Sequence, residues 1–349
     1  MGISFQRFWY LAFLLLVSAE TASSLQFTLN YDPSINPLAL AGFEQAAAFW
    51  SSYLVDPVNV NLNVGFAPLA GNIIGQTSIT EGTANYTNTR FALTLDGKSD
   101  DDVTAVASLQ LGPSFHMSIN DTSDNPNGSG SSTVYEATGN TVLLTTAQAK
   151  AMGFLVNPSI SDASITFNSD LPFDFAHGAV GGSIDPGSYD LVGVATHEIG
   201  HSLGFFSSVD SVDASPGFLA SQYDPSVLDL FRYSTSPLGY GPGVFDLSAG
   251  SAGQYFSVDG GATSIAAFST GANHGNGYQA SHWSPFSGTG IMQPTASQGQ
   301  LLSVTPTDLR AFDVIGWDLE ASEPATIAMC ILGFTAILLR RVRPGRPLG

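Results

Sequence analysis

The segment from Ser188 to Gly204 constrains the fold more than any other part of this 349-residue chain. Its apolar residues recur at steps of three and four, which predicts a helix with one face in the core: Val192, Ala195, Ile199, Leu203 and Phe206. A second stripe combines small residues with two histidines: Gly193, His197, Gly200, His201 and Gly204. Gly204 can end the helix in a left-handed conformation. We therefore expect a buried helix that presents two imidazoles on a glycine-lined face.

His197 and His201 are one helical turn apart, so both imidazoles can reach one metal ion. Glu198 lies about 100° around the helix from His197, a position that suits a base acting on a water molecule rather than a ligand. In a His-Glu-x-x-His helix the metal is zinc, which lowers the pKa of water towards about 7, and the carboxylate takes the proton. The pattern predicts one catalytic zinc ion, with Glu198 as the general base.

A catalytic zinc ion commonly has three protein ligands and one open position, so a third ligand is expected. Asp210 follows the helix closely, whereas His274 and His282 lie further along the chain. His116 and His177 lie upstream, and we interpret them as ordinary loop or core histidines. The residues alone leave the choice among the three downstream candidates open.

Two motifs together resemble the metzincin metallopeptidases. The first is His197-Glu-x-x-His201-x-x-Gly204, and the second is Gly290-Ile-Met292-Gln-Pro294, similar to the methionine-containing turn beneath the metal of that family. Most metzincins have their third histidine three residues after the glycine, where this chain has Ser207. The leishmanolysin-like branch inserts a long segment there and places the histidine shortly before the methionine turn.

The resemblance implies that His282, ten residues before Met292, is the third ligand, ahead of His274 and Asp210. It implies that Met292 packs beneath the metal without binding it. The fold class it implies is α+β: a mixed, twisted sheet, a central zinc-binding helix, a loop-rich C-terminal part with the methionine turn, and a closing helix. No tyrosine closely follows Met292, so the tyrosine ligand of some metzincin branches is expected to be missing.

Elsewhere, hydrophobic periodicity predicts strands over 25–31, 58–66 and 163–168, and helices over 39–54, 145–152 and 305–315. Residues 96–102 and 120–131 are interpreted as solvated polar loops, although their oxygen side chains could also hold Ca²⁺. The Gly, Ser and Asp-rich stretch 209–280 is expected to be an insertion packed on the catalytic unit, with a short helical pattern at 225–231.

Both ends of the chain are typical of targeting segments. Residues 1–24 have the basic start, apolar centre and small residues of a secretory signal peptide, which leaves a catalytic domain over 25–320. In residues 321–349, Ser322-Glu323-Pro324 precedes a short apolar run and four arginines. This tail resembles the PEP-CTERM sorting signal of Gram-negative bacteria, which is removed by an exosortase. A plain tail anchor is the alternative.

The composition excludes several classes of function. Residues 25–322 contain 5 basic and 27 acidic side chains, a net charge of −22, which disfavours nucleic acid and anionic membranes as partners. The single cysteine, Cys330, lies in the C-terminal apolar run, so the domain has no thiol for a disulfide, a thiolate metal site or cysteine nucleophile chemistry.

The hypothesis for the whole chain is an exported zinc metalloendopeptidase of a Gram-negative bacterium. It would be extracellular or associated with the cell surface or matrix, anchored transiently through its terminal segments, and would act on protein or peptide substrates. The alternative is a surface-displayed binding or matrix protein with a structural zinc ion and no turnover. A purely structural site has no need of Glu198, which favours the enzyme.

Overall fold

The structure is a computed structural model that describes residues 24–177, 183–215, 217–234, 243–250, 253–285 and 289–320. The expected sorting tail and nearly all of the expected signal peptide lie outside these residues. Within the described ranges, no helix combines the length and apolar character needed to cross a membrane.

A four-stranded sheet forms one side of the molecule. Its order is β1-β2-β8-β3, with β1, β2 and β8 parallel and β3 antiparallel at one edge. The strands are β1 (Gln26–Asn30), β2 (Asn59–Ala67), β8 (Ala163–Asn168) and β3 (Gly75–Ile79). The parallel pair β1 and β2 needs a crossover, and α1 (Pro37–Tyr53) supplies it. The predicted strand, helix, strand opening is confirmed, as is the strand over 163–168.

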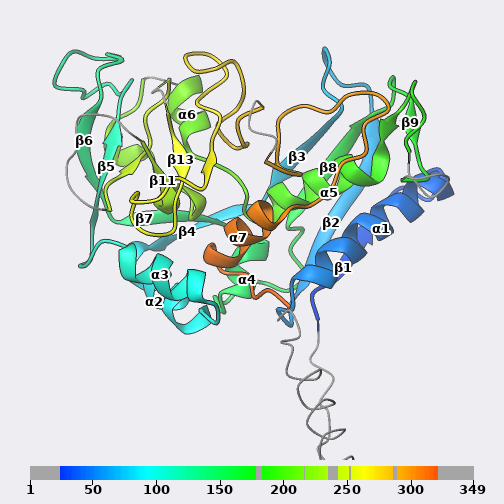
Figure 1. The fold of residues 1–349 in the computed structure, drawn as a ribbon, viewed down its shortest axis with the longest axis horizontal. Coiled ribbons are helices and arrows are strands. Elements are labelled where there is room, and N and C mark those ends of the chain that lie inside the picture. The colour runs from blue at the N-terminus through cyan, green and yellow to red at the C-terminus, as the bar shows by residue number, and fades with distance from the viewer. Residues whose placement is uncertain are drawn as a thin grey trace, which may run out of the picture.

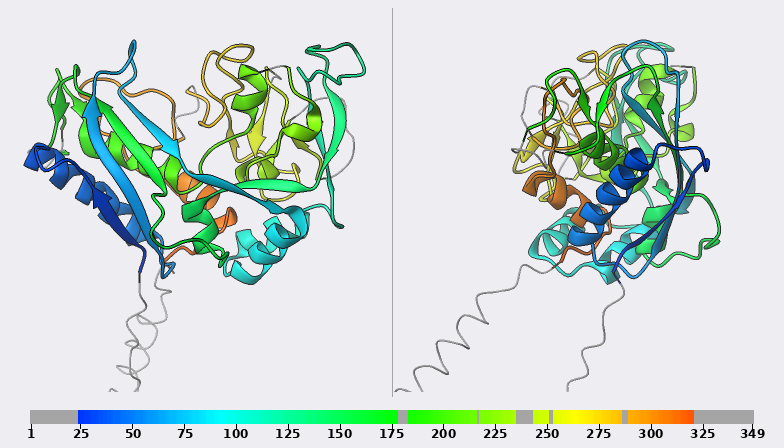
Figure 2. Two further views of the ribbon diagram at one scale, coloured as in Figure 1. Left: turned by 180° about the vertical axis from the view of Figure 1, so that it is seen from behind. Right: turned by 90° about the vertical axis from the view of Figure 1, so that its right-hand side faces the viewer.

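Two helices cover one face of this sheet, α1 and α5 (Leu191–Ser202), as Figures 1 and 2 show. They approach closely because Gly42 of α1 has no side chain: a Cβ atom there would lie 2.3 Å from the Leu191 side chain. Trp50 of α1 donates a hydrogen bond from its indole N–H to the carbonyl of Thr196, 2.9 Å away. The helix that carries His197 and His201 therefore packs against both the sheet and α1.

The rest of the molecule consists of small sheets and short helices (Figure 1). The strands are β4 (Glu81–Asn85) with β7 (Thr141–Thr145); β12 (Phe245–Asp246), β5 (Phe115–Ile119) and β6 (Tyr135–Gly139); β11 (Arg232–Tyr233), β13 (Tyr255–Phe256) and β14 (Ala266–Ala267); and β9 (Phe173–Asp174) with β10 (Tyr189–Asp190). The helices are α2 (Tyr86–Asp96), α3 (Asp100–Ser108), α4 (Thr146–Ala151), α6 (Val209–Ala214) and α7 (Pro306–Val314), with 3₁₀ turns η1 (Ala220–Gln222) and η2 (Leu228–Phe231). The fold class is α+β.

The predicted helices over 145–152 and 305–315 are confirmed as α4 and α7, and the helical pattern at 225–231 is only the 3₁₀ turn η2. Residues 120–131 are loop, as expected. The prediction of a loop over 96–102 is wrong in its second half, where Asp100 begins α3. Ser99 and Asp102 form a capping box, in which each side chain accepts a hydrogen bond from the other residue's backbone N–H.

One continuous cluster of buried apolar residues joins these parts. Its members include Leu203 of the segment after α5, Phe231 and Phe256 of the stretch 209–280, and Phe312 of α7. The stretch 209–280 thus shares its core with α5. Whether it is an insertion relative to other proteins stays a prediction.

Candidate metal centre

The helix α5 is fixed at both of its ends. Asp190 caps its start by accepting a hydrogen bond from the N–H of Gly193 at 3.0 Å. The same carboxylate accepts the N–H of Leu302 at 3.1 Å and lies 2.8 Å from His177 Nδ1. At the other end Gly204 has a φ of 110°, the left-handed conformation expected from the sequence. His177, which we expected to be an ordinary histidine, therefore contacts the cap of the helix and lies apart from the other histidines.

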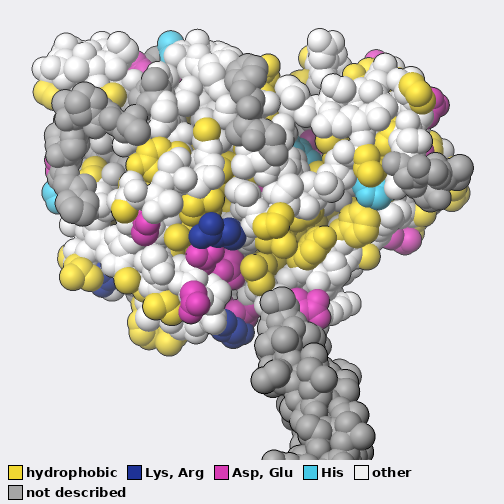
Figure 3. All heavy atoms as spheres, in the orientation of Figure 1, with side chains coloured by type: hydrophobic (Ala, Val, Ile, Leu, Met, Phe, Trp, Pro, Cys, Tyr) yellow, Lys and Arg dark blue, Asp and Glu magenta, His cyan; other side chains and the backbone are white. Residues whose placement is uncertain are grey.

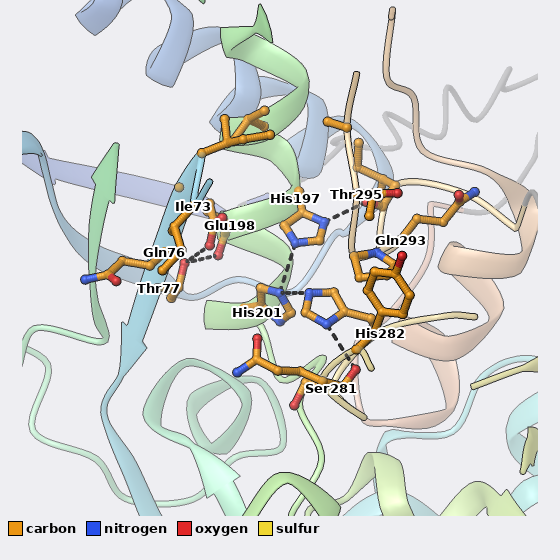
Figure 4. A pocket seen from close by; sticks show the side chains of 18 of the residues that line it. Ile73, Gln76, Thr77, His197, Glu198, His201, Ser281, His282, Gln293 and Thr295 are labelled. Carbon is orange, nitrogen blue, oxygen red and sulfur yellow. Dashed lines mark hydrogen bonds between the residues drawn. The ribbon is translucent and has the colours of Figure 1, made fainter. Parts of the chain in front are cut away.

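Three imidazoles converge beside α5 (Figure 4). The Nε2 atom of His201 lies 3.1 Å from that of His197 and 3.2 Å from that of His282. These three residues form a cluster whose ligand atoms all lie within 4.8 Å of one another, which is close enough for one metal ion. The structure thus brings together the two histidines of the motif and the third one expected from the resemblance.

The second nitrogen of each ring faces a backbone carbonyl. The Nδ1 atoms of His197 and His201 lie 2.7 Å from the oxygens of Ile291 and Phe205, and that of His282 lies 3.2 Å from the oxygen of Gln279. A carbonyl can only accept, so each Nδ1 carries the proton and donates it, which leaves each Nε2 with a lone pair. The lone pair of His201 faces those of the other two rings at 3.1 and 3.2 Å, where lone pairs repel, and a cation between the three nitrogens would remove that repulsion.

Burial favours the neutral form of two of these imidazoles, those of His201 and His282. It lowers the pKa of His201 to about 3 and that of His282 well below its usual value, with the neighbouring histidines adding to both effects. Neutral imidazole is the form that binds a metal ion. The lowered pKa values of His201 and His282 therefore favour metal binding, as does the convergence of the three rings.

The other candidate ligands lie outside this cluster. His274 Nδ1 pairs with the carboxylate of Asp213 at 3.2 Å. Asp210 accepts hydrogen bonds from the backbone of Ala280 and Ser281 instead of pointing at the imidazoles. His116 is half exposed and pairs with Glu136 on β6.

Glu198 is buried, and its carboxylate touches the edge strand β3. The hydroxyl of Thr77 lies 2.7 Å from Glu198 Oε2, where it can donate a hydrogen bond. Gly75, two residues earlier on the same face of β3, leaves room for the carboxylate, because a Cβ atom there would lie 2.9 Å from Oε1. Burial raises the pKa of Glu198, and the Thr77 hydroxyl and His197 oppose that rise. Sequence reasoning missed both β3 residues, since neither belongs to a motif.

The turn from Gly290 to Pro294 supports α5 from below. Ile291 supplies the carbonyl that orients His197, and Met292 packs against Gly200, where a Cβ atom would lie 2.5 Å from the methionine sulfur. Asp308 of α7 holds this turn: it accepts hydrogen bonds from the N–H groups of Ile291 and Met292, and from the indole of Trp283 at 2.8 Å. Asp308 is fully buried, and although it belongs to the helix start expected from Thr305 and Pro306, its contact with this turn could not be predicted from the sequence.

The cluster lies in a cleft of about 980 Å³. One wall is β3 with the residues before it, the floor is α5, and the other wall comes from residues 277–282 and 290–302. The described lining residues include Glu198 and Asp210 but neither lysine nor arginine. The cleft can therefore admit a substrate to the three imidazoles and to Glu198 together.

Comparison of the chain with family models, with curated proteins and with solved structures finds no match. The functional argument therefore depends on the geometry of this site.

Proposed function

We propose that the chain is a zinc-dependent endopeptidase. The observation that carries the proposal is the convergence of three Nε2 atoms, with that of His201 at 3.1 and 3.2 Å from the other two, beside a buried glutamate in an open cleft. Three neutral imidazoles are a ligand set that suits zinc, and the N···N separation expected for a tetrahedral site is about 3.3 Å when Zn–N is about 2.05 Å. The two N···N distances from His201 are close to this value, which supports zinc as the ion.

A zinc ion bound there would supply Lewis acidity, which polarises a peptide carbonyl and makes a nearby water molecule more acidic. His197, His201 and His282 would hold the ion through Nε2, while their Nδ1 hydrogen bonds to carbonyls keep the rings in orientation. Glu198 would take the proton of the attacking water and return it to the leaving amine. Thr77 would hold Oε2 of Glu198 and keep that carboxylate facing the cleft.

The edge strand β3 supports a peptide as the substrate. Among the residues that the structure describes, β3 pairs with β8 alone, and the backbone N–H and C=O groups of its other side could pair with an extended chain. Residues of β3 also line the cleft that contains Glu198. A substrate chain that pairs with β3 would pass over the imidazoles. We further propose, from the terminal segments alone, that the enzyme is exported and sorted to the cell surface or matrix.

The test compares the wild type with Glu198→Gln on a peptide library, with bound zinc measured for both. We expect both proteins to bind one zinc ion and the variant to lose roughly 10²- to 10⁴-fold in kcat, because it lacks the base. Removal of zinc with a chelator should abolish wild-type cleavage, and adding zinc back should restore it. Equal cleavage by Glu198→Gln with zinc retained would contradict the role of Glu198. Zinc binding without cleavage by the wild type would favour the matrix protein with a structural zinc.

A further inference from the structure

The third histidine differs from the other two in how it is held. His197 and His201 belong to one helix, which sets their spacing, whereas His282 lies 81 positions after His201 in a segment without regular secondary structure. A non-helical segment keeps a ligand in place only if its own backbone is fixed. On the C-terminal side, the carbonyl of His282 accepts the N–H of Ser269 and Trp283 donates to the carbonyl of Met292, so the contacts of the residues just before His282 complete its support.

Asp210, on the short helix α6, contacts this segment directly. Its Oδ1 accepts the N–H of Ala280 at 2.6 Å, and its Oδ2 accepts the N–H of Ser281 at 3.0 Å. The hydroxyl of Ser281 also donates to Oδ2, and its oxygen accepts the N–H of Ser207 at 2.9 Å. One carboxylate thus accepts three hydrogen bonds from the two residues that precede His282.

Arg232 holds the same peptide from the other side. It is fully buried, and one guanidinium nitrogen donates to the carbonyl of Ala280 at 2.5 Å. Asp229, also buried, pairs with Arg232 and accepts a hydrogen bond from the hydroxyl of Ser207. Both backbone groups of Ala280 are therefore bonded to charged side chains.

We infer that Asp210 is the positioning residue of the metal site, fixing the 280–281 backbone so that His282 Nε2 meets the nitrogens of His197 and His201. This inference rests on the proposed zinc site and assigns Asp210 a role other than ligation. A carboxylate is required because all three groups that face it are donors. An asparagine would turn an N–H₂ group towards some of those donors and leave hydrogen bonds unmade.

The chain offers a matched control on the same helix. Asp213 is also buried, and it accepts the N–H groups of Asn273 and His274, so it too attaches α6 to a distant loop. That loop does not carry a residue of the cluster. Asp210→Asn and Asp213→Asn therefore remove equivalent bonds, and only the first acts on the segment of His282.

The experiment titrates the metal-free full-length protein and both variants with Co²⁺, reads the visible absorption bands, and then measures Zn²⁺ affinity by competition with a chelator. We expect Asp210→Asn to bind Zn²⁺ roughly 10- to 100-fold more weakly and to give altered Co²⁺ bands, which is the range for residues that orient metal ligands. Asp213→Asn should stay within about threefold of the wild type, with an unchanged spectrum, because unrelated polar substitutions have small effects.

Ser281→Ala keeps the inference testable if Asp210→Asn does not fold. It removes one of the three bonds to Asp210 and should weaken Zn²⁺ binding by a few fold, as expected for the loss of one hydrogen bond. Equal affinities and spectra for the wild type, Asp210→Asn and Ser281→Ala would overturn the positioning role. Failure of the zinc site itself has a different signature, since the wild type and His282→Ala would then give the same Co²⁺ spectrum.

Discussion

Each of the three histidines is oriented by the nitrogen that faces away from the others. The carbonyls that accept from Nδ1 belong to three different segments, at Phe205, Gln279 and Ile291. Their common effect is to select the tautomer that leaves Nε2 unprotonated. Glu198 has a comparable partner in Thr77, whose hydroxyl is the only hydrogen-bond partner of its carboxylate within the described part of the chain.

Thr77 leads to a prediction for the catalytic base. Replacing Thr77 by valine keeps the shape and removes the donor to Glu198 Oε2, so kcat should fall by roughly 10-fold, the effect expected for a hydrogen bond to a charged group. Thr77→Ser keeps the hydroxyl and should retain most of the activity. Steady-state kinetics with equal zinc content checks this, and identical kcat values for Thr77→Val and the wild type would rule the contact out as functional.

The sequence supports different parts of this site to different degrees. The sequence pattern around His197, Glu198 and His201 is sufficient to predict that these residues lie together, because one helix carries all three. His282 needed a family resemblance, since nothing in an irregular segment indicates where its side chain points. Thr77 lies 121 positions before Glu198 and meets it only because β3 is the antiparallel edge strand beside α5. Strand order of this kind depends on tertiary packing, which local periodicity does not encode.

At the scale of elements, α5 packs against α1 and against the 290–294 turn through close contacts that small residues permit. Gly42 of α1 meets Leu191 on one side, and Gly200 meets Met292 on the other. Both contacts are tighter than a Cβ atom would allow. The methionine therefore determines how deeply the 290–294 turn sits under the helix, and through Ile291 it affects the ring of His197.

Gly200→Ala should consequently be destabilising although alanine favours helices. The new methyl group would overlap Met292, which is fully buried, and overpacking of this kind costs about 1–3 kcal/mol. Thermal unfolding should show a Tm lower by several degrees. Adding Met292→Val, which reduces the side-chain volume, should recover part of the loss in a double-mutant cycle. Strict additivity of the two substitutions would contradict direct contact.

The elements that periodicity predicted best are those with a long apolar stripe, such as α1 and the buried strand β8. The missed helix α3 has only nine residues and begins with three aspartates, so its composition is that of a solvated loop. The sequence feature that indicates this helix is the capping box that begins at Ser99. The acidic residues of the first turn also interact favourably with the helix dipole.

At the scale of the whole molecule, none of the described lysine and arginine residues lines the cleft. Arg232 and Lys150 have buried side chains paired with Asp229 and Asp162, and Arg310 pairs with Asp101. On the face drawn in Figure 3, basic side chains are scarce and lie next to acidic ones. With a net charge of −22 over residues 25–322 and no lysine or arginine among the described lining residues, we expect a negative field around the cleft.

This charge distribution predicts a preference among substrates. Peptides with lysine or arginine flanking the cleaved bond should have a KM roughly 10-fold lower than the same peptides with glutamate at those positions. The difference should shrink as salt rises from about 0.05 to 0.5 M, because screening shortens the range of the field. Kinetics on such a peptide pair at the two salt concentrations measures it. A preference for the acidic peptide would be inconsistent with this view of the cleft.

Three carboxylates with raised pKa values, Asp56, Asp96 and Asp313, should make the stability of the protein depend on pH. Burial raises the pKa of Asp56 to about 6, and the pKa values of Asp96 and Asp313 to about 7, with neighbouring carboxylates adding to each rise. In the unfolded chain these groups titrate near about 4, so the folded state binds more protons between the two values. Their contribution to stability is complete below pH 4 and is lost as pH rises through 6 to 7.

The Tm of Asp96→Asn, which has no proton to lose, should therefore fall by less than that of the wild type between pH 5.5 and pH 8. The expected difference between the two proteins is a few degrees. Asp170→Asn, at an exposed position, serves as the control and should follow the wild type. If Tm depended on pH in the same way for all three proteins, Asp96 would be excluded as a source of the pH dependence.

The site takes residues from distant parts of one chain, which has a consequence for when it forms. Synthesis delivers the helix with its two histidines first, His282 some 80 residues later, and Asp308, which holds the turn below, later still. A nascent or truncated chain that ends before His282 thus has two of the three proposed metal ligands, His197 and His201, and lacks the third. Under the proposed function, the enzyme can hydrolyse proteins only after α7 has packed into the core. Incompletely synthesised chains in the producing cell would therefore have no proteolytic activity.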